Sequence, residues 1–343
     1  ISGIVPTLIY YGIQAIHPAV FLISSCIICA VVSVMTGSSW TTVATIGLAL
    51  LGIGRALGFE DGWTAGAIIS GAYFGDKMSP LSDTTILASS VSGTPLFTHI
   101  RYMMITTGPT IFITLVIFSL AGIWMGNNSA TDTAIYIHTL ENTFNITPWL
   151  LLVPVITALL IVKKVSAIVT LFIAAFIAGI TALFFQPHII SAVANEGMMG
   201  TSSGLTFVEG FKGLFITYYG STAIDTGNIA LNELVATRGM TGMLATVFLI
   251  IAAGTFGGTL VGSGMLQSLT EMLTRFISRR VSMVASTVGT GVMANMVTGD
   301  QYLSIILTSS LYKDLYEKRG YESKLLSRSV EDSATVVSVL IPW

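Results

Sequence analysis

Acidic and hydroxyl side chains are concentrated in one segment, residues 71–85, that has apolar residues on both sides. Pro80 supplies no backbone N–H and disfavours helix at the residue before it, so we expect the carbonyl of Asp76 to lose its helical hydrogen bond. Carboxylate, hydroxyl and free carbonyl oxygens are the hard ligands that alkali cations prefer. The segment is therefore a candidate ion-binding site, with ligands predicted at Asp76, Ser79, Ser82, Asp83 and Thr84.

A second set of polar residues lies in the C-terminal part of the chain. Asp300 follows a Thr-Gly pair and shares a helical face with Ser304 and Thr308, and Asp332 is followed by Ser333. Ionisable groups inside apolar segments are costly and usually face a cavity or one another. We therefore expect these residues to complete the site that the first segment begins.

Each candidate also has a purely structural interpretation. Asp76 and Lys77 are compatible with a solvated loop between two membrane helices, and Asp83 with the N-cap of the helix that follows. Asp300 is compatible with a hairpin tip that caps the returning helix. The remaining acidic candidates are compatible with a cytoplasmic surface: Glu331 and Asp332, next to Arg328.

Other residues that could carry charge or bind a metal have weaker patterns. Asp225 lies in another interrupted apolar run and is predicted to line the pathway, with a structural role equally open. Cys26 and Cys29 have C-x-x-C spacing, but no further Cys or His ligand pair accompanies them, so packing is expected. Interfacial anchoring is expected for the histidines, which lie near the ends of apolar segments: His17, His99, His138 and His188.

The composition indicates a membrane protein. Of 343 residues, 53% are apolar and 9% are charged, whereas about a quarter are charged in an average soluble domain. The net charge of −2 offers no basic surface for nucleic acid. Because the chain opens on Ile1 and closes just after an apolar run, we expect it to be part of a longer protein with further spans at both ends.

Long apolar runs predict ordinary membrane helices at four places: 102–125, 148–162, 165–185 and from 241 onward. The positive-inside rule places Lys163 and Lys164 in the cytoplasm, and the loop 126–147, which has no Lys or Arg, outside. The predicted organisation is a first membrane repeat with connecting helices, an external linker and a second membrane repeat: 1–185, 186–210 and 211–343.

Two further apolar runs are interrupted and are typical of helical hairpins or broken helices. One stops at residues 36–39 (Thr-Gly-Ser-Ser) and the other at residues 298–301 (Thr-Gly-Asp-Gln). In hydrocarbon an interrupted helix leaves backbone groups unpaired, which is tolerated only where protein, water or a bound ion satisfies them. We therefore predict that the broken-helix tips belong to the site: Thr36, Gly37, Ser38, Thr298 and Gly299.

The two interruptions are similar to one another. Residues 36–40 align with 298–302, and the downstream segment 82–89 aligns with 331–338, which pairs Asp83 with Asp332. Two matches in the same order indicate an internal duplication, and duplicated halves with paired broken helices are typical of secondary transporters. The expected fold is an all-α polytopic membrane protein with two repeats, each with helical hairpins and broken helices.

Residues 75–85 (Gly-Asp-Lys-Met-Ser-Pro-Leu-Ser-Asp-Thr-Thr) resemble the signature of the NhaC-type sodium/proton antiporter family. The similarity extends through 299–300 and 329–335, and so covers essentially the whole chain. It implies membership of a wider ion-transporter superfamily with paired hairpins, unwound helices and elevator-like movement. A sister branch that exchanges malate and protons for sodium and lactate has similar motifs, and the resemblance does not separate the two branches.

The resemblance implies a secondary active transporter that exchanges sodium for protons across the cell inner (cytoplasmic) membrane, with no cofactor beyond the coupling ions. In this hypothesis Asp83 and Asp332, with Asp76 or Asp300, hold either sodium or protons, because both compete for the same oxygens. An alternative is a carboxylate exchanger that binds malate or lactate at the breaks, where helix N-termini favour anions. An enzyme or a channel is less favoured, since the sequence has no H-E-x-x-H zinc motif. A homodimer is compatible with all of these.

Overall fold

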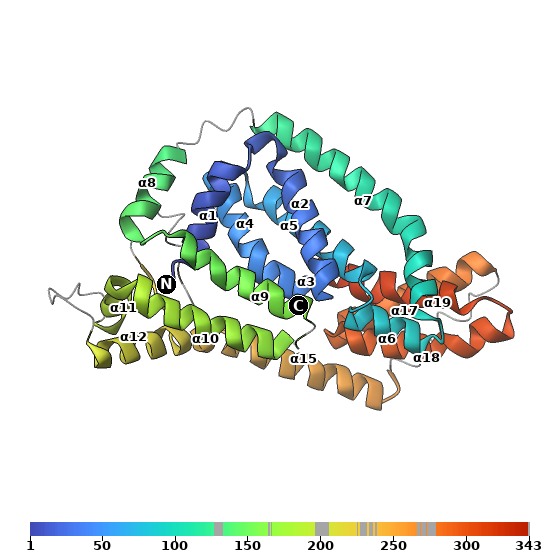
Figure 1. The fold of residues 1–343 in the computed structure, drawn as a ribbon. Helices are drawn as coiled ribbons and strands as arrows, with labels where there is room; N and C mark the ends of the chain where they lie inside the picture. The colour runs from blue at the N-terminus through green and yellow to red at the C-terminus, as the bar shows by residue number, and fades with distance from the viewer. Residues whose placement is uncertain are drawn as a thin grey trace. The chain divides into compact units, whose positions relative to one another are not determined.

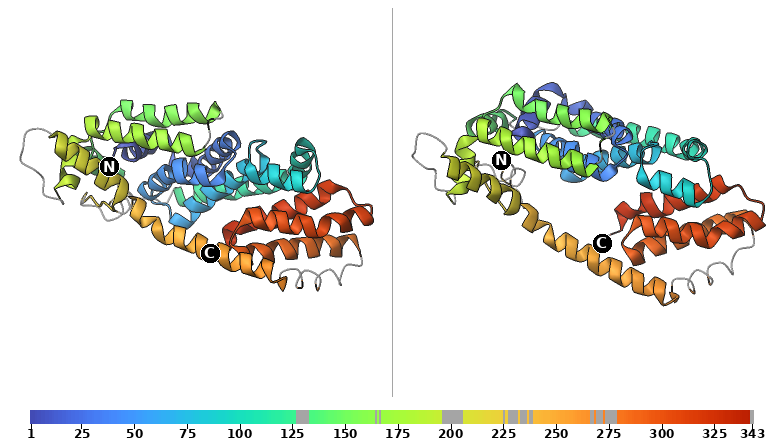
Figure 2. Two further views of the ribbon diagram at one scale, coloured as in Figure 1. Left: turned by 90° about the horizontal axis from the view of Figure 1, so that it is seen from below. Right: turned by 60° about the horizontal axis from the view of Figure 1, so that its bottom comes forward.

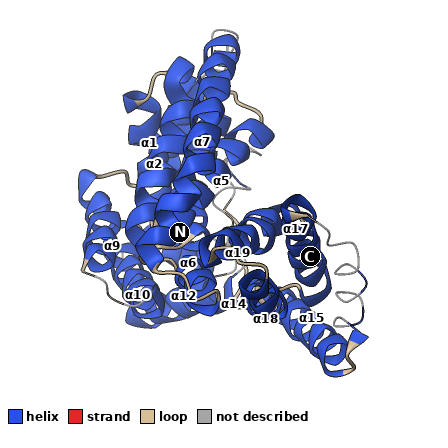
Figure 3. Ribbon diagram, turned by 90° about the vertical axis from the view of Figure 1, so that its right-hand side faces the viewer, coloured by secondary structure: helices blue, strands red, loops and turns tan. Residues whose placement is uncertain are grey.

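The computed structural model consists of helices joined by loops (Figures 1 and 3). It describes residues 1–126, 133–163, 165, 167–195, 206–224, 226, 232, 236, 239–265, 268, 272 and 279–341. The chain forms two compact units, one of residues 1–72 and 113–244 and the other of residues 73–112 and 245–343. Each unit has its own helices and packing.

The first unit contains most of the N-terminal and central helices. These are α1 (Ile4–Ala15), η1 (Pro18–Val20), α2 (Phe21–Thr36), α3 (Ser39–Thr42), the π turn η2 (Val43–Gly47), α4 (Leu48–Ala56), α8 (Thr133–Thr143), η3 (Pro148–Leu151), α9 (Leu152–Val162), α10 (Ala167–Phe185), α11 (Pro187–Ala194), α12 (Phe207–Tyr219) and α14 (Gly239–Gly242). Three helices contain residues of both units: α5 (Asp61–Met78), α7 (Leu96–Gly126) and α15 (Leu244–Gly262).

The second unit is built around a group of helices that Figure 1 draws together in cyan and red. They are α6 (Asp83–Val91), α17 (Arg280–Thr298), α18 (Gln301–Lys318), α19 (Ser323–Glu331), the π turn η4 (Asp332–Val336) and η5 (Val337–Leu340). Their core is apolar and includes Met283, Ile305, Leu326, Val330 and Ala334. The end of α5 joins this unit and brings Lys77 to it.

Several described helices are long and apolar enough to cross a membrane. Three pass this test alone: Pro18–Thr36, Leu96–Met125 and Arg280–Thr298. Two bent pairs pass together, with angles of 93° and 100° at their breaks. Large apolar side chains on α7 are exposed, including Trp124 at 74%, which suits contact with lipid. The predicted class, an all-α polytopic membrane protein, is confirmed.

The second interruption is a helical hairpin, as predicted. α17 ends at Thr298, and α18 begins at Gln301 and returns antiparallel along it (Figure 2). Hydroxyl pairs join the two helices: Thr290 Oγ1 lies 2.9 Å from Tyr312 Oη, and Thr287 Oγ1 lies 3.1 Å from Tyr316 Oη. Because residues earlier in α17 pair with residues later in α18, the chain has reversed.

The tip of this hairpin satisfies its own backbone. Gly299 has a φ of 60°, and its N–H donates to the carbonyl of Asn295, so α17 ends in a left-handed cap. Asp300 is the N-cap of α18 and accepts a hydrogen bond of 2.7 Å from the N–H of Leu303. Thr298 Oγ1 receives the N–H of Asp300 at 3.3 Å. The helix break therefore does not need a bound ion to pair these groups.

The first interruption repeats the same local geometry. Gly37 has a φ of 66° and donates to the carbonyl of Ser33, while Ser38 caps α3 by accepting from the N–H of Thr41 at 3.2 Å. Thr36 Oγ1 receives the N–H of Ser38, also at 3.2 Å. Each of these bonds has its counterpart 262 residues later, at the spacing that separates position 37 from position 299.

The same spacing continues beyond the breaks. Gly58 and Gly320 both have positive φ, at 80° and 69°, directly after α4 and α18. Two hydrogen bonds to the helices that follow also match: Ser33 Oγ donates to the carbonyl of Ala72 at 2.6 Å, and Asn295 Nδ2 donates to the carbonyl of Ala334 at 2.7 Å. Matching bonds at one constant spacing support the predicted duplication.

The spacing of 262 residues gives a different alignment from the sequence match of 82–89 with 331–338. It pairs Ala72 with Ala334, and therefore Asp332 with Ser70 and not with Asp83. The match of 82–89 with 331–338 rests on Ser, Thr and Asp, which recur in membrane helices without common descent. The matching hydrogen bonds therefore favour Ser70, and not Asp83, as the counterpart of Asp332.

In each of the two similar segments, the third helix packs closely against the first: α5 against α2, and α19 with η4 against α17. The glycine that permits this approach lies on the third helix in one segment and on the first helix in the other. In the first unit a Cβ on Gly71 would lie 2.1 Å from the carbonyl oxygen of Cys26. In the second unit the glycine is on the hairpin, and a Cβ on Gly291 would lie 2.1 Å from Ser333 Oγ. Each close approach therefore needs its own glycine.

Gly299→Ala tests the left-handed cap at the hairpin tip. We expect it to destabilise the protein by about 1–2 kcal/mol, because an L-residue with a Cβ is strained in this conformation. The measurement is the thermal unfolding midpoint of the purified full chain in detergent.

Gly289→Ala is the matched control in the same hairpin. Gly289 lies within α17 with nothing within 4 Å of the added Cβ, so alanine should leave the midpoint unchanged or raise it. Equal midpoints for the two variants would contradict the role of the cap.

Candidate functional site

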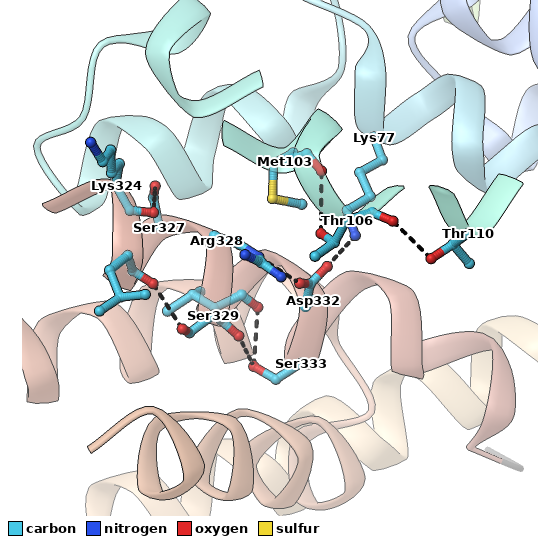
Figure 4. A network of polar contacts seen from close by, with 12 residues as sticks. Lys77, Met103, Thr106, Thr110, Lys324, Ser327, Arg328, Ser329, Asp332 and Ser333 are labelled. Atoms are coloured by element: carbon cyan, nitrogen blue, oxygen red, sulfur yellow. Dashed lines mark hydrogen bonds and ion pairs between the residues drawn. The ribbon is translucent and has the colours of Figure 1, made fainter. Parts of the chain in front are cut away.

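A charge network in the second unit brings together residues that are far apart in sequence. Lys77 Nζ, near the end of α5, donates to Asp332 Oδ1 at the start of η4 (Figure 4). The Nε of Arg328 lies 3.5 Å from the other carboxylate oxygen of Asp332. The Lys77 side chain is only 8% exposed, so its charge depends on this partner. Two cations thus share one carboxylate.

The π turn η4 places Asp332 and its neighbours. A π turn leaves the regular helical hydrogen-bond pattern, and such turns occur frequently at functional sites. The Asn295 side chain holds the turn through the Ala334 carbonyl. Ser333 Oγ donates to the carbonyl of Ser329 at 2.8 Å and faces Gly291, so this predicted ligand lies inside the helix packing beside Asp332.

Glu331 is a buried carboxylate, although its position next to Arg328 in the sequence is compatible with a cytoplasmic surface. Its side chain has no exposed area, and Thr84 Oγ1 donates to its Oε1 at 3.3 Å. Lys77, Asp76 and Asp332 act on it electrostatically. The cytoplasmic-surface interpretation of Glu331 is therefore wrong. The helical spacing in the sequence does carry a signal of this burial, because Glu331 shares a helical face with Ser327, Val330 and Ala334, all of which are buried.

The loop between α5 and α6 differs from the sequence expectation. The carbonyl of Asp76 does not lose its partner, because it accepts the N–H of Ser79 at 3.0 Å. Ser82, not Asp83, is the N-cap of α6, and its Oγ accepts the N–H of Thr85 at 3.4 Å. Asp83 is the first residue of the helix and is exposed.

The predicted oxygen ligands of this loop divide into buried and exposed groups. Asp76, Ser79, Ser82 and Thr84 are all buried, and Ser82 Oγ lies 3.1 Å from Thr84 Oγ1. A hydroxyl chain thus leads from Ser82 through Thr84 to Glu331. The buried members of the predicted set are therefore joined to the charge network.

The predicted carboxylates Asp83 and Asp300 are both exposed. They share one neighbour, since Asp83, Asp76 and Asp300 all act electrostatically on Tyr302 of α18. Asp300 also has the capping role that the structural interpretation gives it. Across the described part of the chain, no three Asp, Glu, His or Cys side chains approach closely enough to share one metal ion. A cation here would need hydroxyl or carbonyl oxygens as well.

His99 is a further buried member of this unit, contrary to its predicted interfacial position. It is fully buried near the start of α7, and its Nδ1 lies 2.9 Å from Ser327 Oγ. Interfacial anchoring is therefore wrong for His99. Its position among apolar residues gives no signal of the Ser327 partner, which is 228 residues away.

Two groups of predicted site residues are not joined to this network by any described contact. Thr36, Gly37 and Ser38 form a capped tip within the first unit. Thr298 and Gly299 form the corresponding tip in the second unit. Asp225 lies outside the described residues.

Comparisons with known proteins agree with the sequence motif. The profile of the Na+/H+ antiporter family matches residues 71–343. The Na(+)/H(+) antiporter NhaC of Bacillus subtilis (strain 168) is 37% identical over 344 residues, which is 100% of this chain and 72% of the relative. The Malate-2H(+)/Na(+)-lactate antiporter of the same organism is 36% identical over 345 residues, which is 100% of this chain and 69% of the relative.

A third relative is named for a different exchange. The arginine/ornithine antiporter ArcD of Halobacterium salinarum is 31% identical over 346 residues, which is 100% of this chain and 67% of the relative. No solved structure matches the chain. The matched profile covers most of the sequence, and the relatives align along all of it. The chain therefore belongs to the Na+/H+ antiporter family.

Proposed function

We propose that the protein exchanges sodium ions for protons across the cytoplasmic membrane. The observation that carries this proposal is the ion pair between Lys77 and Asp332, two charges held together in a membrane protein. Intramembrane ionisable residues are costly and mark ion pathways. A relative with 37% identity is named as a Na(+)/H(+) antiporter, which supports the same ions for this chain.

The ion pair offers a physical route to exchange. A sodium ion that binds the Asp332 carboxylate must displace the Lys77 ammonium from the same oxygen. The Lys77 side chain, 8% exposed, would then be a charge without its partner, which is unfavourable in a low-dielectric site. Loss of one proton from the ammonium removes that cost and leaves a neutral amine. One sodium ion bound is thus matched by one proton released.

The exposed carboxylates have an accessory role in this proposal. Asp83 and Asp300 both act on Tyr302 and are exposed, so they would raise the local concentration of cations and give sodium its first ligand at Asp83. Asp76 is buried and is an electrostatic neighbour of both Tyr302 and Glu331.

Carboxylate exchange is the second candidate, since one relative is named as a malate and lactate antiporter. The hairpin tip at 298–301 is a poor anion site, because Asp300 already places a carboxylate at the N-terminus of α18. A malate or lactate ion there would meet a like charge. We therefore favour sodium and protons over carboxylates for this chain.

Replacing Asp332 tests the exchange directly. In liposomes that contain the full chain, we expect Asp332→Asn to reduce sodium-driven proton movement at least tenfold, since the shared carboxylate is lost. Asp83→Asn should instead raise the sodium concentration for half-maximal transport about threefold, because an exposed carboxylate contributes less. The readout is a pH-sensitive dye inside the vesicles after a sodium pulse.

Asp314→Asn is the matched control for both variants, because Asp314 is an exposed carboxylate of α18 away from the network. It should transport like the unaltered protein. Exchange that persists unchanged in both Asp332→Asn and Asp83→Asn would remove these two residues from the mechanism.

Counterflow of labelled lactate separates the two candidate functions. We expect vesicles loaded with unlabelled lactate or malate to take up no more label than empty lipid vesicles, while the same preparation shows sodium-driven proton movement. Lactate uptake that requires both the protein and a sodium gradient would instead establish carboxylate exchange.

A further inference from the structure

Glu331 is a buried carboxylate whose nearest cation is engaged elsewhere. Lys77 donates to Asp332, and Arg328 also contacts Asp332. Oε1 of Glu331 accepts from Thr84, while its Oε2 is inaccessible to solvent and makes no hydrogen bond of ordinary geometry with the described residues. A fully buried carboxylate requires a partner, because its charge is expensive in a low-dielectric environment.

A second buried oxygen faces the same carboxylate. Thr335 lies one turn after Glu331 in the π turn, is 2% exposed, and its Oγ1 also makes no hydrogen bond of ordinary geometry. The Thr335 hydroxyl makes only a weak hydrogen bond to the Glu331 carboxylate. These two inaccessible oxygen atoms share no more than that weak hydrogen bond, so a small cation between them would satisfy both better.

Thr84 contributes a third oxygen from another element. Its Oγ1 lies 3.3 Å from Glu331 Oε1 and 3.1 Å from Ser82 Oγ, which is itself buried. Carboxylate and hydroxyl oxygens are hard ligands suited to an alkali cation. The charged neighbours of Glu331 are Lys77 and Asp76 from α5, and Asp332, the next residue, at the start of η4. Counted with Glu331 itself, three carboxylates share two cations, Lys77 and Arg328, which leaves room for one more positive charge.

We propose that Glu331, Thr84 and Thr335 are direct oxygen ligands of the transported sodium ion. This inference rests on the proposed function and places the ion beside, and not only on, Asp332. It also gives the Lys77–Asp332 pair a neighbouring cation, so that sodium and the Lys77 ammonium repel one another while both are charged. The sodium site then spans α6, α19 and η4.

Sodium binding is measured on the purified full chain in detergent, as the rise in unfolding midpoint on adding NaCl relative to KCl at equal ionic strength. A ligand that binds the folded state raises the midpoint with its concentration, which yields an apparent dissociation constant. We expect Glu331→Gln to weaken sodium binding at least tenfold. Thr335→Val should weaken it about threefold to tenfold, because one neutral ligand is lost.

Matched controls use the same substitutions away from the network. Glu317→Gln, on the exposed side of α18, and Thr255→Val, on exposed α15, should bind sodium like the unaltered protein. Unchanged sodium affinity in Glu331→Gln would overturn the proposal. If that variant does not fold, Thr335→Val and Thr84→Val decide, and full sodium affinity in both would overturn it equally.

The binding measurement also separates this proposal from the proposed function. Sodium binding that depends on Glu331, in a protein that moves no protons, would refute the exchange and support the ligand set. Sodium-driven proton movement that is unaltered by Glu331→Gln would refute the ligand set and support the exchange. Asp332→Asn provides the reference, because the proposed exchange requires it.

Discussion

The arrangement of the second unit depends on how the charges of its buried carboxylates are neutralised away from water. Asp332 is shared by Lys77 and Arg328, whereas Glu331, its direct neighbour in sequence, accepts a hydrogen bond from the Thr84 hydroxyl. The penalty for burying an ion is several kcal/mol even after relaxation. Such a network is therefore poor at stabilising the fold and well suited to trading one positive charge for another. Two hydrogen bonds hold the segments around both carboxylates: one joins Ser82 Oγ and Thr84 Oγ1, and the other joins the Asn295 side chain and the Ala334 carbonyl.

The helix breaks serve a different purpose from the one that their composition suggests. Hydroxyls and glycines at an interrupted membrane helix can bind an ion, but here they pair with the backbone of the break itself. Thr298, Gly299 and Asp300 complete a chain reversal without outside help. The charge network lies one helix further along, around Lys77 and the π turn. A break and a binding site are therefore separable features of this fold.

Local features were predictable from sequence, and contacts between distant segments were not. The Thr-Gly interruptions follow from the left-handed conformation that glycine accepts and from the capping side chain after it. The ion pair joins residues 255 positions apart, so spacing carries no trace of it. The error at Asp76 is instructive: Pro80 does remove the expected donor, but Ser79 supplies its own N–H one residue earlier.

The two similar segments place the glycine of their close helix contact on different helices, which limits how helices can be exchanged between them. In one copy Gly71 lies against the carbonyl of Cys26, and in the other Ser333 lies against Gly291. A chimaera that exchanged only the third helices would set Ser333 against the first copy's hairpin, where no glycine receives it. The reciprocal exchange would leave Gly71 facing Gly291 across a void. Each hairpin and its third helix are therefore a matched pair, and we expect a chimaera that mixes them to pack poorly.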